Sequence, residues 1–235
     1  MHGDSGILLA ALGLILSGDR DLIEIVNLSL AVTLSAVALA CVIGLPLGAA
    51  VGAWRFPGRA AVSVTLNALM GLPPVVVGLT VYLMLSAAGP FGPLRLLYTP
   101  TAMIIAQTIL VTPIIAALTR QSVEDLHQEY RDQFVSLGVG PLQRLAALLW
   151  DARLGLVTVA LAGFGRAMAE VGAVMIVGGN INHVTRVMTT TIALETSKGH
   201  LELALALGVV LLVLALVVSA AVMAVRGLTL DAAHA

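Results

Sequence analysis

Two ionisable residues, Arg166 and Glu170, stand four positions apart inside a segment apolar enough to lie in a membrane. In a helix, this spacing places both side chains on one face. Ionisable groups at membrane depth usually face the interior of a helix bundle and are paired. The two residues therefore predict either an internal ion pair that fixes packing or a polar lining for the path of a charged solute.

Few other residues are placed for chemistry. The histidines, at positions 2, 127, 183, 200 and 234, fall in expected loops or termini, and the single Cys41 lies in an apolar run. The chain has no GxxxxGK[ST], HExxH or GxSxG motif, so a nucleotide-hydrolysing, zinc-protease or serine-hydrolase site is not indicated. We expect no catalytic residue, no metal site and no cofactor, and an enzyme is disfavoured.

The composition excludes an ordinary soluble domain. Hydrophobic residues make up 59% of the 235 positions and charged residues 11%, against roughly a quarter charged in soluble proteins. The net charge of −1 gives no indication of nucleic acid as a partner. Because a membrane span needs about 20 apolar residues, we predict an all-α polytopic membrane protein with five spans, at about 22–53, 60–86, 100–118, 154–177 and 201–225.

The two ends of the chain lie outside these spans. The apolar run from Ile7 to Leu16 is too short to cross a bilayer, and it lacks the flanks of a signal peptide. Residues 1–21 are therefore predicted to form an interfacial or packed helix that ends at Ser17-Gly18. Residues 227–235 are predicted to form a short tail.

Glycine and proline mark the special positions within the spans. Gly44, Gly48 and Gly52 recur every fourth residue, which gives span 1 a face where another helix can approach closely. Pro73-Pro74 interrupts span 2, either as a simple kink or as part of a pathway lined by freed carbonyl groups. The stretch ending at Asn180 is typical of a helix stop. The expected pathway residues are Pro73, Pro74, Arg166, Glu170 and Asn180.

A polar island covers residues 119–153, between spans 3 and 4, and holds nine of the 25 charged residues. Apolar residues recur at helical spacing on both sides of Gly138, and Pro141 suits the first position of a helix. We predict two amphipathic helices joined by a glycine turn. Their buried sides would carry Val123, Leu126, Tyr130, Phe134 and Leu137 in the first helix, and Leu142, Leu145 and Leu149 in the second.

The distribution of basic residues predicts the orientation in the membrane. Placing the 54–59 turn, the island and the C-terminal end from Arg226 on one side gives that side seven arginines, against four basic residues on the other. The arginine-rich side is expected to be cytoplasmic. The N-terminus would then lie outside and the C-terminus inside.

At the island, the chain resembles the permease subunits of bacterial ABC importers. Their cytoplasmic loop carries a Glu-Ala-Ala triplet, then a glycine and then an Ile-x-Leu-Pro segment. Here Asp132-Gln133-Phe134 takes the place of the triplet, Gly138 that of the glycine and Leu148 that of the isoleucine. The resemblance implies the five-span core of the type I ABC importer permease fold, in a bacterial inner membrane. It also implies that a separate ATPase docks on the loop, through Asp132, Gln133, Phe134, Gly138, Gly140, Pro141, Leu142 and Arg144.

One branch of these permeases is more similar than the rest. Residues 71–78, 162–181 and 185–199 resemble tungstate-import permeases, which are relatives of molybdate permeases. This resemblance implies a homodimer in the lipid bilayer, two copies of the ATPase and an external binding protein that delivers the oxyanion. Selection of the oxyanion would reside mainly in that binding protein.

Three alternatives stay open at this stage. A self-contained, proton-coupled carrier would need ionisable relays near the membrane midplane, for which Arg166 and Glu170 are the available residues. A membrane enzyme or assembly factor would act at the interface. An ABC permease for molybdate or another oxyanion would carry the same motifs.

Overall fold

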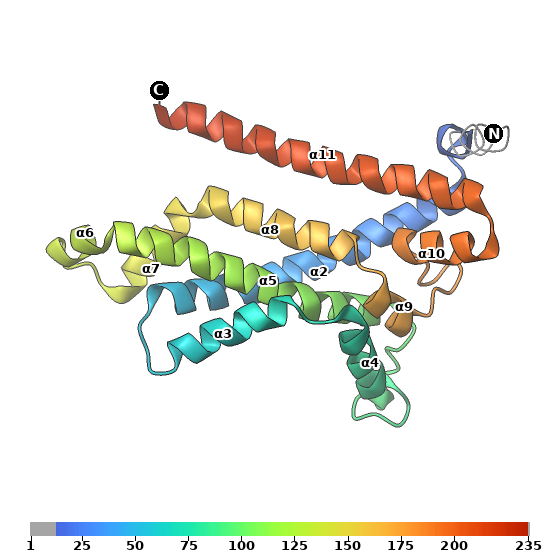
Figure 1. The fold of residues 1–235 in the computed structure, drawn as a ribbon, viewed down its shortest axis with the longest axis horizontal. Helices are drawn as coiled ribbons and strands as arrows, with labels where there is room; N and C mark the ends of the chain where they lie inside the picture. Colours follow the sequence, from blue (N-terminus) through green and yellow to red (C-terminus); the bar gives the residue numbers. More distant parts are fainter. Residues whose placement is uncertain (1–12, 235) are drawn as a thin grey trace. The chain divides into compact units, whose positions relative to one another are not determined.

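The computed structural model describes residues 13–234, and helices dominate this part of the chain, with no strand in it (Figure 1). A short helical stretch at residues 13–17 ends at Gly18, and the first twelve residues of the predicted interfacial segment lie outside the described residues. The elements that follow are α2 (Arg20–Ala53), α3 (Arg59–Met70), α4 (Pro74–Leu85), the 3₁₀ helix η1 (Gly92–Leu94), α5 (Pro100–Glu129), α6 (Arg131–Ser136), α7 (Pro141–Asp151), α8 (Arg153–Met168), α9 (Gly172–Gly178), α10 (Met188–Lys198) and α11 (Leu201–His234).

The described chain divides into two compact units. The first contains residues 13–36, 73–107 and 167–220, and the second contains residues 37–72, 108–166 and 221–234. Helices α2, α5, α8 and α11 each continue from one unit into the other. Each unit is described below by itself.

The second unit is built on a close contact between α2 and α5. A Cβ atom on Gly48 would overlap the carbonyl oxygen of Ala116, and one on Gly52 would lie 2.7 Å from the carbonyl oxygen of Arg120. Only a residue without a side chain permits this backbone separation. The prediction that the glycine face of span 1 receives another helix is confirmed, and the partner is α5.

A small apolar core joins α2, α5, α6 and α7 within the second unit. Its buried members are Ala49, Ala53, Val123, Phe134 and Leu148. Elsewhere in this unit, Leu66 of α3 packs against Ala116 and Ala117 of α5. The helices of the polar island are therefore fixed to the longer helices by side-chain packing.

In the first unit, α4 packs against α9. A Cβ atom on Gly78 would lie 2.7 Å from the Cα atom of Ala173, so here too the backbones approach closely. The Tyr98 amide donates a hydrogen bond to the carbonyl of Val177, 3.0 Å away, and this bond holds the loop before α5 against α9.

Three helical segments of the described chain are long and apolar enough to cross a membrane: Arg20–Ala53, Pro100–Glu129 and Leu201–Ala221. Two further pairs, α3 with α4 and α7 with α8, reach the necessary length only if each broken pair counts as one span. The five-span arrangement therefore stays a prediction.

The helix boundaries differ from the predicted span boundaries at several places. Helix α5 continues to Glu129, eleven residues beyond the expected end of span 3, so the first part of the island extends that span and His127 lies on a helix. Segment 154–177 is not one helix, because α8 ends at Met168 and α9 begins at Gly172. The C-terminal helix includes residues expected to form a tail.

Candidate functional site

The turn around Gly138 is the most exposed part of the polar island. Gly138 has a φ angle of +62°, in the left-handed region, and a Cβ atom there would meet no atom within 4 Å. Leu137 and Leu142, on either side of the turn, are 76% and 73% exposed, and Asp132 and Gln133 are exposed on α6. The turn thus presents apolar and polar side chains to its surroundings.

Beneath this surface, Phe134 anchors α6 and α7. Its ring is 9% exposed in the apolar core, and the guanidinium carbon of Arg144 lies 5.5 Å from the ring centroid. Arg144 also donates a hydrogen bond to the carbonyl of Val139, 3.1 Å away. A cation over an aromatic face is attracted by the ring quadrupole. Phe134 and Arg144 therefore stabilise the conformation of the turn from its buried side.

Two residues predicted for buried helix faces are exposed instead. Leu137 follows the end of α6, and Leu142 lies in the first turn of α7, so both fall beyond the apolar core. In α7 the buried residue is Leu148, with Leu145 and Leu149 partly buried against the core. The spacing alone did not reveal where the core ends along each helix.

A cluster of ionic contacts ties this region to the turn at 54–59. The Arg59 guanidinium donates to the carbonyl oxygens of Val51 and Gly52, at 2.7 and 3.3 Å. It also lies 2.9 Å from a Glu124 carboxylate oxygen. The other oxygen of Glu124 accepts a hydrogen bond from Arg120, at 2.7 Å. Sequence reasoning missed this cluster, although a basic residue a few positions beyond the end of a helix is a known signal for capping its last carbonyls.

The proline pair lies at the break between α3 and α4. Pro73 is the extended residue just before α4 and Pro74 is its first residue, a position where the missing amide hydrogen leaves no bond unmade. The prolines thus begin a helix as well as interrupting the segment.

Glu170 is buried, at 4% exposure, and lies beyond the end of α8. Its Oε1 atom accepts a hydrogen bond from the amide of Ala173, 3.1 Å away. Its carbonyl accepts one from the Thr189 hydroxyl, at 2.9 Å. The expectation that Arg166 and Glu170 share one helical face is wrong, because the helix ends between them.

Asn180 joins α9 to α10. Its amide nitrogen donates to the carbonyl of Thr190, at 3.3 Å, and its amide oxygen accepts from the Thr190 hydroxyl, at 3.0 Å. Both polar atoms of the Asn180 side chain are thus hydrogen-bonded, and they link the α9–α10 loop to α10. Its φ angle of 49° fits the predicted helix stop.

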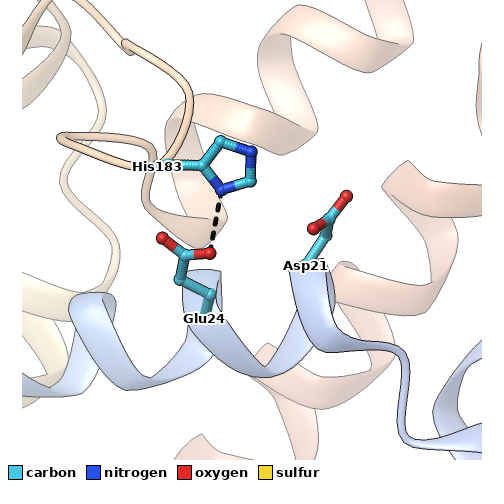
Figure 2. Close-up of side chains that lie close together, drawn as sticks. All are labelled: Asp21, Glu24 and His183. Carbon is cyan, nitrogen blue, oxygen red and sulfur yellow. Dashed lines mark hydrogen bonds and ion pairs between the residues drawn. The ribbon is translucent and has the colours of Figure 1, made fainter.

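Three chemistry-bearing side chains that are far apart in the sequence gather at the start of α2. Asp21 and Glu24 face His183 of the α9–α10 loop, and one ligand atom from each lies within 4.8 Å of the others (Figure 2). The Nδ1 atom of His183 is 2.9 Å from Glu24 Oε2, and this contact raises the pKa of His183. Arg186 borders the small cavity beside the three residues. The positive charge of Arg186 beside the cluster opposes binding of a metal cation. The cluster is therefore best described as a polar contact that joins the loop to α2.

Comparison with known proteins identifies the class of the chain. Residues 44–226 match the family described as binding-protein-dependent transport system inner membrane component. The chain belongs to this family. It is therefore a membrane-embedded transport permease subunit, and the family prediction made from the polar island is confirmed.

Relatives along almost the full length carry related descriptions. The chain is 43% identical over 204 residues to a probable anion ABC transporter permease protein of Haloferax volcanii, covering 85% of this chain and 88% of the relative. It is 41% identical over 213 residues to the tungstate uptake system permease protein TupB of Peptoclostridium acidaminophilum, covering 91% and 93%.

The fold is also found among solved structures. A chain from inward-facing conformations of the MetNI methionine ABC transporter matches with a TM-score of 0.68, covering 87% of this chain and 94% of that chain at 19% sequence identity. At that identity, the match establishes the fold alone. The predicted type I ABC importer permease fold is confirmed.

Proposed function

We propose that this chain is the permease subunit of an ATP-driven importer for tungstate, delivered by an external binding protein. The observation that carries the proposal is the 41% identity, over 91% of the chain, to a permease named for tungstate uptake. The relative described as an anion ABC permease, at 43% identity, supports the same class of solute.

A separate ATPase subunit would dock on the island surface, formed by Asp132, Gln133, Gly138, Gly140, Pro141 and Leu142. This surface combines exposed apolar and polar side chains, as the centres of protein interfaces often do. Phe134 and Arg144 would support it from inside the second unit. Movement of the ATPases would then be transmitted through α6 and α7 to α2 and α5, which pack on the same core.

Pairing in the second unit supports the proposed order of spans. Gly44, Gly48 and Gly52 of α2 meet positions near 115, 116 and 120 of α5, so the two helices run in the same direction. Successive spans cross the membrane in alternating directions. If α2 and α5 are the first and third spans, they must therefore run in the same direction. With the island inside, the N-terminus lies outside the cell and the C-terminus inside, and two copies of the chain would form the permease.

The path for the oxyanion would involve the broken segments of the first unit, near Pro73, Pro74, Glu170 and Asn180. Non-helical backbone at membrane depth occurs where it is buried in protein or lines a water-filled cavity. Glu170 would brace this region through its bond to the Ala173 amide.

Uptake of radiolabelled tungstate by cells with and without the gene tests the proposal. We expect uptake to disappear on deletion of the gene and to return when the chain is supplied from a plasmid. A tenfold excess of unlabelled molybdate should compete less well than unlabelled tungstate. If molybdate competed equally, the substrate would be a broader oxyanion class. Uptake driven by a proton gradient in liposomes that contain this chain alone would overturn the importer assignment.

A further inference from the structure

A small cavity lies inside the first unit, between α2, α5, the end of α8 and the start of α10. Its polar lining consists of Ser29, Thr33, Gln107 and Thr189, and Met168 and Met188 contribute apolar walls. The space open to the centre of a water molecule is about 10 Å³, which is close to the minimum that holds one water.

Gln107 lines this cavity and carries a buried polar atom without a protein partner. The side chain is 4% exposed, and its Nε2 atom donates to the carbonyl oxygen of Ala167, at 3.2 Å. Because a carbonyl oxygen only accepts hydrogen bonds, the amide cannot be turned the other way. Its Oε1 atom has no protein partner. A buried polar atom without a partner is uncommon, and ordered water is a frequent explanation.

Two of the neighbouring hydroxyl groups, those of Ser29 and Thr189, are also left as acceptors. Ser29 donates its proton to the carbonyl of Ile25, at 2.6 Å, and accepts a bond from the Met188 amide, at 2.7 Å. Thr189 donates its proton to the carbonyl of Glu170, at 2.9 Å. A ligand in the cavity can therefore donate hydrogen bonds to Ser29 and Thr189. An oxyanion is excluded by the size of the cavity, which has room for about one water molecule.

We infer that the cavity binds a single water molecule, which donates one hydrogen bond to Gln107 Oε1 and the other to a lining hydroxyl oxygen. The water connects α2, α5 and the start of α10 in the first unit, where direct side-chain contacts leave a gap. The inference does not depend on which oxyanion is transported.

Radiolytic footprinting of the intact permease, reconstituted in lipid nanodiscs, tests the site. Hydroxyl radicals formed from a bound water oxidise the side chains beside it, and methionine adds one oxygen atom. Met168 and Met188 are 6% and 1% exposed, and the matched control is Met103, at 0% exposure, which does not line the cavity. We expect Met168 and Met188 to be oxidised several-fold faster than Met103. Equal rates for the three would overturn the inference, and this comparison needs no variant.

A variant removes the acceptor. In Gln107→Leu, which keeps a similar volume, the oxidation rates of Met168 and Met188 should fall to that of Met103. Gln128→Leu, the same replacement at an exposed position of α5 that does not line the cavity, should leave the oxidation rates unchanged. Unchanged oxidation in a folded Gln107→Leu protein would contradict the assignment of Gln107 as the water ligand.

Discussion

At the level of single residues, the contact between His183 and Glu24 predicts a dependence of stability on pH. The hydrogen bond and the negative charge of Glu24 raise the pKa of His183 above its usual value of about 6.5. A histidine with a raised pKa contributes stability that is fully present below its unfolded-state value and is lost as pH rises through the folded-state value.

Replacing His183 with Gln should therefore lower the melting temperature slightly at pH 5.5 and have almost no effect at pH 8.5. Thermal unfolding of the detergent-solubilised protein at the two pH values measures the difference. A larger effect of His183→Gln at pH 8.5 than at pH 5.5 would contradict the proposed ion pair.

At the level of elements, the Arg59–Glu124 contact joins the start of α3 to α5, and the same guanidinium binds the last carbonyls of α2. Both side chains are 26% exposed, so solvent screens the pair less than it screens a fully exposed one. We expect a coupling energy of about 1 kcal/mol between the two residues in a double-mutant cycle. Arg59→Lys should lose most of it, because lysine lacks the planar fork that contacts two carbonyls and a carboxylate.

The measurement is thermal or denaturant unfolding of Arg59→Lys, Glu124→Gln and the double variant. Arg55→Lys, at an exposed arginine of the same turn, is the matched control and should change little. If the effects of Arg59→Lys and Glu124→Gln on the free energy of unfolding were strictly additive, the ion pair would not stabilise the protein.

The Gly138 turn gives a second prediction about an element. A bulky side chain at Gly138 should obstruct the ATPase, so Gly138→Trp is expected to reduce substrate-driven ATP hydrolysis and uptake at least tenfold. Since Gly138 has a positive φ angle, part of any effect arises from backbone strain. Gly199→Trp supplies the control, because Gly199 also has a positive φ angle, +84°, and open space around it.

Co-purification with the ATPase distinguishes docking from folding. Gly138→Trp should be present in the membrane at normal levels and fail to retain the ATPase, whereas Gly199→Trp should retain it. Normal uptake by the Gly138 variant would count against the docking surface.

Sequence patterns predicted some elements well and others poorly, for physical reasons. The four-residue spacing of Gly44, Gly48 and Gly52 predicted a close helix contact because backbone approach depends only on the missing side chains. The spacing of Arg166 and Glu170 gave a wrong prediction, because helical periodicity assumes an unbroken helix. The break at 169–171 contains no proline that would have indicated it in the sequence. Gln107 and Arg59 act through partners 60 or more positions away, and no local pattern encodes such contacts.

At the level of the whole molecule, the orientation in the membrane is the main prediction. In a Cys41→Ser background, Gln133→Cys on α6 and Ser197→Cys on α10 place single thiols on opposite expected sides, both at exposed positions. A membrane-impermeant maleimide added to intact cells should label Ser197→Cys and not Gln133→Cys. Inverted membrane vesicles are the control, in which the labelling should reverse. Labelling of Gln133→Cys in intact cells would invert the proposed topology.

The family and the fold could be predicted from the sequence because both depend on distributed features, namely long apolar segments and a polar island of recognisable pattern. The division into two compact units could not, since the boundaries at residues 36, 107 and 166 fall inside continuous helices. A helix that passes through two units has no change of composition at the boundary, so the sequence carries no local mark of it.

The glycine contact between α2 and α5 also limits how these helices can move. Each glycine lies over a backbone carbonyl of α5, so sliding α2 by one or two residues would drive Cβ atoms into those carbonyls. The next register free of collision is four residues away, a displacement of about 6 Å along the axis. Within the second unit the two helices therefore either keep their register or shift along each other by four residues at once. Spin labels on this pair should keep a constant separation throughout the transport cycle.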